Sequence, residues 1–291
     1  MSGRSSTTVA RRRRDAPPTA PALLYLYCVV EAGTGAERVL ASGQVPGLEP
    51  GEALFPIEHM GLAAAVSRVP AATFQEEPLN ALLADLPRLA PYAVRHEEAV
   101  RALLAEAPAL VPMAFGTVYL DERRVRGLLR EQAPELRELL ARLRGKQEWG
   151  VKVFRDTARL LEAADTTSPE LRQLAAEAAA AGPGRAYLLG KRRERMRATE
   201  AARLASEAID GVVERLAALS DAALSDPDAV DPSSDMPLGL KAAFLVAVER
   251  ADTFRAAAEE LRTTNEPRGL NLELSGPWAP YSFVGERRGG A

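Results

Sequence analysis

The feature that most constrains the fold is a long stretch, from residue 187 to residue 219, that contains no proline. Near its end, four apolar residues recur at alternating spacings of three and four: Ile209, Val212, Leu216 and Leu219. This spacing is typical of a coiled-coil seam. At 1.5 Å per residue such a helix is about 50 Å long, more than the core of a small domain requires. We therefore expect a projecting helix that packs antiparallel to a second helix at residues 171–181.

The composition is that of a folded globular protein, and it restricts the classes of partner. Of the 291 residues, 47% are hydrophobic and 26% are charged, which excludes wholesale disorder. The 37 Lys and Arg residues against 40 Asp and Glu residues leave a net charge of -3, whereas nucleic-acid-binding domains are usually basic. No segment approaches the roughly 20 apolar residues that a membrane helix needs. We expect neither a nucleic acid nor a membrane as a partner.

The first half of the chain has the pattern of an α+β domain. Residues 1–20 are rich in Arg, Ser, Thr and Pro, so we expect a disordered arginine-rich tail. Alternating and continuous apolar runs predict strands at residues 23–30, 55–58, 62–69 and 110–120. Helices are predicted from Pro78, at residues 92–106, after an Asp121 cap, and after Pro134 up to Gly145. The N-terminal α+β domain is therefore placed at residues 21–145.

The second half begins with a strand at residues 149–154, followed by helices that start at Asp156 and Ser168. An acidic loop follows at residues 221–235, then a strand at 242–249, a helix capped by Asp252 and a strand at 270–274. If the acidic segment holds a short strand, the order is strand, helices, two strands, helix, strand. This is the ferredoxin-like order, with the long helical hairpin inserted at the first crossover. The predicted fold class is thus α+β with two domains, the second at residues 146–284, and a flexible tail at residues 285–291.

The known chemical motifs are absent or incomplete. Gly33-Thr34-Gly35 follows a strand, but Arg38 stands at the third glycine of a dinucleotide fingerprint, and no helix is expected there. His96-Glu97 lacks the second histidine of a zinc protease, so a partly buried structural histidine is favoured. The single cysteine, Cys28, cannot form an intramolecular disulfide, which favours the reducing cytoplasm. We predict no catalytic, cofactor-binding or metal-binding residue.

A run of basic residues near the start of the long helix is a candidate contact surface. It includes Lys191, Arg192 and Arg193, and with Arg195 and Arg197 against Glu194 the local charge is +4. On an exposed helix such a run is most often a solvated face, although it can meet an acidic partner. The alternative function is a ligand- or nucleotide-regulated enzyme or switch that uses the basic helix at residues 191–197.

The C-terminal segment is the second candidate contact surface. Three of the chain's 15 aromatic residues, Trp278, Tyr281 and Phe283, fall within residues 275–283. Pro277 and Pro280 forbid a helix there and hold the rings in an extended arrangement. Two interpretations remain: the rings seal the bottom of the second domain, or they form an aromatic docking surface for a partner.

Five sequence blocks, in order, resemble one known family. They lie at residues 24–27, 96–97, 111–118, 148–153 and 272–284, and Tyr187-Leu188 followed by the basic run also fits. Together they resemble the gas vesicle synthesis proteins of the GvpL/GvpF type. Ala279 stands where that family usually has proline.

The resemblance implies two α+β domains, the second ferredoxin-like with a coiled-coil element. It also implies a non-enzymatic accessory role in building gas vesicles, in the cytoplasm and on the vesicle itself. The implied partners are the small hydrophobic shell protein and other accessory proteins, and the family's members are minor vesicle components or accessory proteins. Our hypothesis is that the protein binds the shell protein before or during assembly, prevents its aggregation and aids nucleation of the vesicle. No cofactor is implied.

Overall fold

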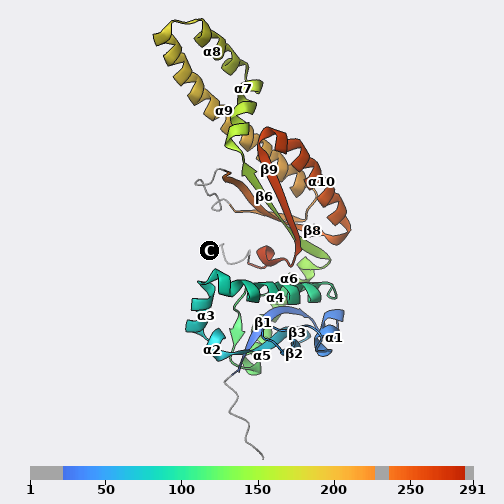
Figure 1. Ribbon diagram of the computed structural model, residues 1–291. Helices are drawn as coiled ribbons and strands as arrows, with labels where there is room; N and C mark the ends of the chain where they lie inside the picture. The colour runs from blue at the N-terminus through green and yellow to red at the C-terminus, as the bar shows by residue number, and fades with distance from the viewer. Residues whose placement is uncertain (1–21, 227–235, 286–291) are drawn as a thin grey trace, which may run out of the picture.

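The computed structural model describes residues 22–226 and 236–285. It is a mixed helix and sheet protein with two antiparallel sheets, one in each half of the chain (Figure 1). The predicted tail at residues 1–20 lies outside the described residues, as do most of the tail at 285–291 and part of the acidic loop. Among the helices of the described part, none combines the length and the apolar character that crossing a membrane requires.

The first sheet is built around β1 (Ala22–Glu31). On one side β1 pairs with β3 (Leu62–Pro70), which pairs with β2 (Phe55–His59) across the predicted turn. Residues 23–30 of β1 are all buried, because helices cover both faces of the sheet. The register shifts between Leu26 and Cys28, so that Tyr27 and Cys28 both face the same cluster.

The strand predicted at residues 110–120 is interrupted, and that expectation was wrong in part. Two short strands, β4 (Leu110–Pro112) and β5 (Val118–Tyr119), both pair with β1. Between them the chain turns, and the Thr117 amide and hydroxyl both donate to the Ala114 carbonyl. Gly116 has a φ of +87°, a conformation that glycine adopts without steric cost. The local turn therefore overrides the continuous apolar pattern.

Helices flank this sheet, with α4 on one face and α5 and α6 on the other. The helices of the first half are α1 (Gly35–Ala41), α2 (Ala71–Phe74), α3 (Glu76–Leu83), α4 (Leu86–Leu104), α5 (Glu122–Glu131) and α6 (Ala133–Leu143). The Asp121 cap is confirmed, because its carboxylate accepts the Arg124 amide. Two expectations were wrong: α1 does open after Gly33-Thr34, and α4 begins six residues before Tyr92. Asp85 caps α4, and Pro87 is tolerated in its first turn.

The second sheet has the order β7-β8-β6-β9, and every neighbouring pair is antiparallel. Its strands are β6 (Lys146–Arg155), β7 (Ala222–Ser225), β8 (Leu238–Ala247) and β9 (Leu270–Trp278). A short strand thus does lie in the acidic segment. The helix α10 (Ala251–Asn265) packs on one face, flanked by the short turns η2 (Val248–Arg250) and η3 (Glu266–Arg268). Asp252 lies in the first turn of α10 rather than at its cap, where Arg250 stands.

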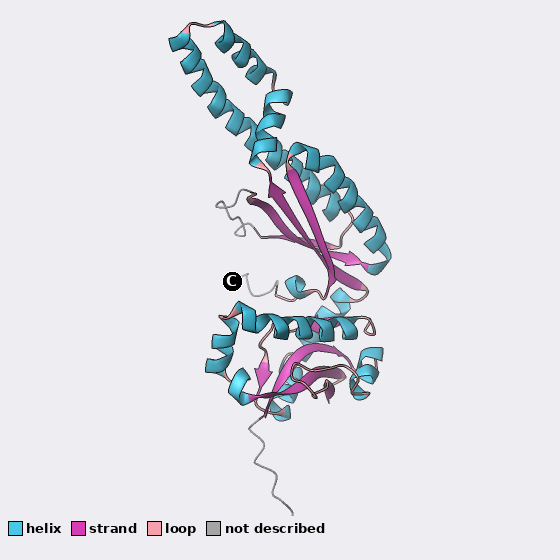
Figure 2. Ribbon diagram, viewed as in Figure 1, coloured by secondary structure: helices cyan, strands magenta, loops and turns pink. Residues whose placement is uncertain are grey.

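Three helices form an arm that projects from one end of the second sheet, away from the first half (Figure 2). They are α7 (Thr157–Thr167), α8 (Pro169–Ala180) and α9 (Pro183–Ala217). The carboxylate of Asp156 and the hydroxyl of Ser168 cap α7 and α8 as predicted. The long helix α9 begins four residues earlier than expected, because Pro183 suits a first helical turn. Helix α8 packs antiparallel beside it, joined by a short turn (Figure 1).

Buried apolar clusters extend across residue 145, where the sequence analysis placed the end of the N-terminal domain. One cluster joins Leu26 and Leu140 of the first half to Leu245 of β8 and to Phe283. Another joins the α4 face of the first sheet to Ala279, which follows β9. The two halves of the chain therefore share buried apolar surface, and the C-terminal segment contributes to both clusters.

Candidate functional site: a buried junction and three surfaces

The centre of the junction is a chain of polar side chains that connects β1, α4 and the C-terminal segment. The Tyr25 hydroxyl lies 2.9 Å from His96 Nδ1, and the Tyr281 hydroxyl lies 3.0 Å from His96 Nε2. The Gly116 amide donates to the Tyr25 oxygen, so that hydroxyl is free to donate to Nδ1. Tyr281 in turn bonds to the Glu97 carboxylate. All these donors and acceptors match if the neutral imidazole carries its proton on Nε2.

Burial explains the protonation state of this histidine. His96 is 5% exposed, and burial lowers its pKa from 6.5 to about 4. Its ring also stacks on Tyr27, with the ring centroids 5.6 Å apart. Both ring nitrogens are used in hydrogen bonds to tyrosines, which agrees with the structural role that the sequence favoured.

A second polar contact ties the C-terminal segment to β6. The Glu148 carboxylate accepts from the Ser282 amide at 2.9 Å and from the Ser282 hydroxyl at 2.7 Å. Burial raises the pKa of Glu148, and these two hydrogen bonds oppose that shift. Because Ser282 lies in the short turn η4 (Tyr281–Phe283), these bonds hold the rings of that turn against the junction.

The aromatic residues predicted to bind a partner have different positions. Phe283 is 1% exposed and lies in the cluster shared by both halves. Tyr281 packs on the α4 side of the first sheet. Trp278 is half-buried, its indole N–H donates to Ser275 Oγ at 3.3 Å, and the Arg101 guanidinium lies 5.9 Å from its ring centroid. A partner-binding role for the three residues stays a prediction: Trp278 and Tyr281 are partly exposed, whereas Phe283 is buried.

The five sequence blocks that carry the family resemblance meet at this junction. Tyr25 lies in the first block, His96 in the second, Gly116 in the third, Glu148 in the fourth and Tyr281 in the fifth. The motifs therefore encode the joint between the two halves.

Nothing in the described residues provides a metal site or a reactive thiol. No group of three or more His, Cys, Asp or Glu side chains among them is arranged to hold a metal ion. Burial raises the pKa of the Cys28 thiol to about 12, because the thiolate would lie in an apolar strand.

On the arm, most of the predicted basic residues pair within the chain. Arg193 and Arg197 both contact the Asp165 carboxylate of α7, at 2.6 and 2.7 Å. Lys191 pairs with Glu194 at 2.9 Å. Arg192 is exposed and has no ion-pair partner among the described residues. The helix is continuous through Gly190, so its amides bond within the helix and form no phosphate cradle, which disfavours a nucleotide switch here.

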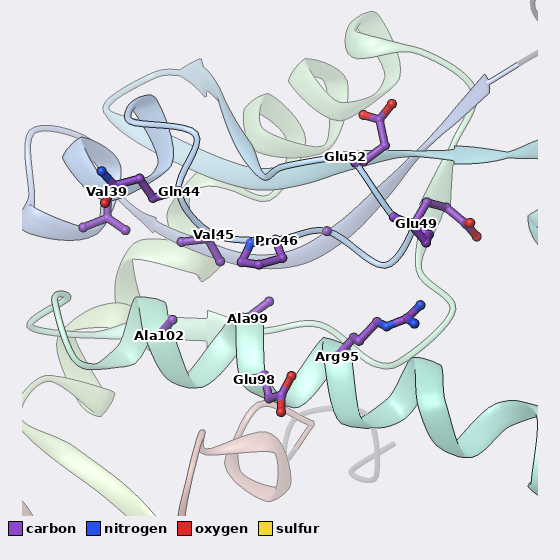
Figure 3. A pocket seen from close by; sticks show the side chains of 13 residues that line it. Val39, Gln44, Val45, Pro46, Glu49, Glu52, Arg95, Glu98, Ala99 and Ala102 are labelled. Carbon is purple, nitrogen blue, oxygen red and sulfur yellow. The ribbon is translucent and has the colours of Figure 1, made fainter.

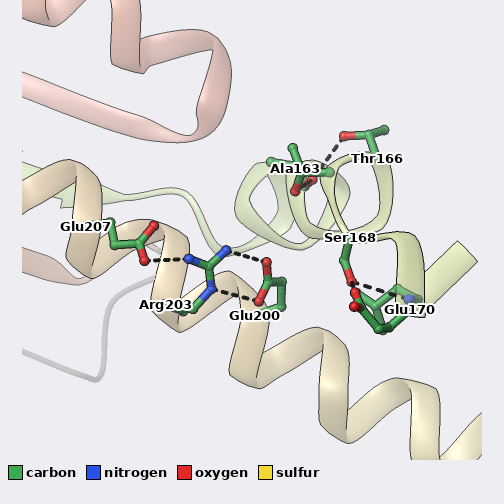
Figure 4. A network of polar contacts seen from close by, with 9 residues as sticks. Ala163, Thr166, Ser168, Glu170, Glu200, Arg203 and Glu207 are labelled. Atoms are coloured by element: carbon green, nitrogen blue, oxygen red, sulfur yellow. Dashed lines mark hydrogen bonds and ion pairs between the residues drawn. The ribbon is translucent and has the colours of Figure 1, made fainter.

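Nearer the base of the arm, charge is balanced on α9 itself. Arg203 contacts Glu200 one turn before it and Glu207 one turn after it, and Figure 4 shows its guanidinium between the two carboxylates. These pairs follow the three- and four-residue spacings that place side chains together on a helix.

A surface groove of about 550 Å³ lies between α4 and the segment that joins α1 to β2. Its charged lining side chains are Glu49, Glu52, Glu98 and Arg95 (Figure 3). The Arg95 guanidinium donates to the Leu48 carbonyl at 2.8 Å and ties α4 to this segment. The groove is therefore acidic, with three carboxylates for one cation.

The first half also exposes an apolar ridge on α4, formed by Leu86, Ala90 and Val94. These residues recur at intervals of four, on the side of the helix opposite His96 and Leu103. Leu86 is 73% exposed and Val94 is 56% exposed. Sequence reasoning missed this ridge, because it began the helix at residue 92. The interval of four would have revealed it if the helix had been extended through Pro91.

The overall structure is similar to that of solved gas vesicle proteins. The crystal structure of GvpF from an Anabaena species has a TM-score of 0.65 at 21% identity, covering 90% of this chain and 98% of that one. GvpF from Microcystis aeruginosa has a TM-score of 0.61 at the same identity and coverage. At this identity the likeness shows the fold, a mixed helix and sheet architecture of the GvpF kind.

Sequence comparisons then establish the family. The model of the family "Gas vesicle synthesis protein GvpL/GvpF" matches residues 23–285, so the chain belongs to this family. Gas vesicle protein L of a Streptomyces strain is 35% identical over 278 residues, covering 90% of this chain and 93% of that protein. Gas vesicle protein F of the same strain is 33% identical over 176 residues, covering 59% and 68%. The resemblance predicted from the sequence blocks is confirmed, and the family is not a known family of enzymes.

Proposed function

We propose that the protein is a non-enzymatic accessory factor of gas vesicle assembly that binds the hydrophobic shell protein and prevents its aggregation. The observation that carries this proposal, together with family membership, is the exposed apolar ridge of Leu86, Ala90 and Val94. Apolar side chains aligned on the solvent side of a helix mark a surface that a partner covers.

The energetics of covering the ridge are favourable. Each Leu or Val side chain removed from water contributes about 1.5–3 kcal/mol when fully buried. A shell subunit that presents an apolar face to gas exposes that face to water until it is incorporated, and the ridge offers it a reversible apolar contact. The rigid helix needs little ordering to bind, because Asp85 caps it and its inner face is packed on β1.

We also propose that the protein binds other accessory proteins and acts in the cytoplasm and on the vesicle, as its family membership suggests. Among the predicted contact residues, Trp278, Lys191 and Arg192 are the proposed direct contacts, whereas Arg193, which pairs with Asp165 of α7, is proposed to hold the arm helices together. Tyr281 and Phe283 are proposed to act indirectly, because their packing holds the segment that presents Trp278.

The proposed architecture has an N-terminal domain at residues 21–145 and a ferredoxin-like domain at residues 146–284 that carries the coiled-coil arm. The order of strands and helices and the antiparallel sheet order β7-β8-β6-β9 support the ferredoxin-like assignment. The burial of Val212 and Leu216 on α9 supports the predicted seam.

The function is tested by diluting denatured shell protein into buffer with increasing amounts of the full chain and following light scattering. We expect scattering to fall as the accessory protein approaches and exceeds the shell protein in molar amount. Unchanged scattering at a tenfold excess would contradict the proposal, and an equal effect of serum albumin would show that the suppression is non-specific.

A further inference from the structure

The far end of the arm carries exposed side chains that the chain's own core does not use. All the buried residues of α9 lie at or beyond Ala201, and those of α8 are Leu171 and Leu174, near its start. The outer turns of both helices, on either side of the 180–183 turn, therefore bury no side chain within the described structure. These turns add little to the stability of the core, yet they expose Tyr187 at 65% and Leu188 at 68%.

On these outer turns, α9 has a second seam that faces solvent. Its members recur at spacings of three, four and three, and all are exposed: Arg185, Leu188, Arg192 and Arg195. The adjacent side of the same turns, with Leu189, Arg193 and Met196, is partly buried toward the other arm helices. Side chains at these spacings share one face of the helix, and such a face can pack against a second helix.

The charge of this seam is not balanced by ion pairs among the residues that the structure describes. None of the guanidinium groups of Arg185, Arg192 and Arg195 forms an ion pair with any described residue, whereas Arg203, further along α9, lies between two glutamates. The seam therefore presents three cations around one leucine over about 15 Å, which is three helical turns. Its complement is a helix with acidic residues around an apolar one.

We infer that this outer seam of α9 docks an acidic amphipathic helix of another protein. A nucleic acid is a poorer match, because Leu188 and Tyr187 lie among the cations and the whole chain has a net charge of -3. The inference rests on the second part of the proposed function, binding to other accessory proteins. The shell-binding ridge on α4 is a separate surface.

The test uses the full chain and a fluorescein-labelled synthetic helix of 18 residues with glutamates flanking a leucine seam, in a fluorescence anisotropy titration. The matched control probe has glutamine at every glutamate position.

The test variant is R185E/R192E/R195E, and R185Q/R192Q/R195Q is a milder second form. The control variant, R123E/R126E/R130E, makes the same charge change on the exposed face of α5. A further variant, L188S, tests how much the apolar side chain of Leu188 contributes to binding. Circular dichroism checks that each variant is folded.

We expect the wild type to bind the acidic helix at least tenfold more tightly than the glutamine helix, and binding to weaken with salt. The arm charge variants and L188S should each lose at least tenfold in affinity, while the α5 variant binds as the wild type does. Equal affinity for both probes, an equal loss in the α5 variant, or tighter arm-dependent binding of single-stranded DNA or anionic vesicles would overturn the inference. Suppression of shell-protein scattering, measured on the same preparations, should persist in the arm variants. If the wild type fails to suppress the scattering, that result counts against the proposed function and not against this inference.

Discussion

His96 Nε2 lies 3.0 Å from the Tyr281 hydroxyl, a contact between two positions 185 residues apart in the chain. Through it, a helix of the first half is joined directly to the segment that follows the last strand of the second half. In the same short turn, Ser282 is anchored on the Glu148 carboxylate and Phe283 in a cluster shared by both halves. The C-terminal segment therefore acts as a connector between the halves, and its variants should affect the stability of the whole molecule.

Truncating the connector should destabilise the protein. Phe283→Ala removes a buried ring and is expected to lower the free energy of unfolding by about 3–5 kcal/mol. Tyr281→Phe leaves His96 Nε2 without its partner and should cost about 1–3 kcal/mol. Urea unfolding followed by tryptophan fluorescence measures both, with the exposed Tyr187→Phe as the control. A loss below about 0.5 kcal/mol for Phe283→Ala would show that the segment is not part of the core.

The buried histidine should make stability depend on pH in a defined direction. Because the folded-state pKa of His96 is about 4 and the unfolded value is 6.5, only the unfolded state gains a proton between these values. Stability should therefore fall as the pH drops from 6.5 to 4, by up to about 3 kcal/mol. The raised pKa values of Glu97 and Glu148 act in the opposite direction, since they favour the folded state as the pH falls.

The comparison that isolates the histidine is therefore the wild type against His96→Gln, unfolded by urea at several pH values. As the pH falls from 6.5 to 4, the unfolding free energy of the wild type should decrease more than that of the variant. Parallel curves would mean that the imidazole is not held neutral.

Removing the shared carboxylate of the arm should loosen it locally. In Asp165→Asn the guanidinium groups of Arg193 and Arg197 lose their charged partner, whose side chain is 23% exposed. We expect a cost of about 1 kcal/mol or less, because these groups are partly solvated. Hydrogen exchange should quicken in the outer turns of α8 and α9 and stay unchanged in β1 and β6. Faster exchange throughout the molecule would contradict a local role.

Polar substitution of the α4 ridge should affect binding without affecting folding. Leu86→Ser and Val94→Ser change side chains that are 73% and 56% exposed, so the thermal midpoint should stay within about 2 °C of the wild type. The double variant should lose most of its ability to suppress shell-protein scattering. Leu120→Ser, at a residue 68% exposed elsewhere in the first half, is the matched control and should behave as the wild type. Equal suppression by the double variant would remove the ridge from the proposed function.

Local sequence signals predicted many of the elements, because the forces that start and stop an element act over a few residues. The caps at Asp121, Asp156 and Ser168 and the hairpin at Gly61 needed only neighbouring atoms. The helix predicted at residues 92–106 begins at Leu86 in the structure, which accommodates Pro91 inside the helix. That error concealed the ridge of Leu86, Ala90 and Val94.

The basic run at residues 191–197 and the aromatic segment at residues 275–283 show what the sequence alone does not determine. Their composition indicates that they can bind something, but not whether the occupant is another protein or a distant part of the same chain. Asp165 is 28 residues from Arg193, and His96 is 185 residues from Tyr281. Only long-range packing reveals that these groups are already engaged.

The residues alone were sufficient for the family, the mixed helix and sheet composition and the long arm, since motif order, periodicity and capping are local or linear properties. Packing in three dimensions assigned Tyr281 and Phe283 to an internal joint and left the Arg185–Leu188–Arg192–Arg195 seam facing water. Burial and charge pairing depend on atoms contributed by segments far apart in the chain, and no linear pattern specifies which of those segments will meet.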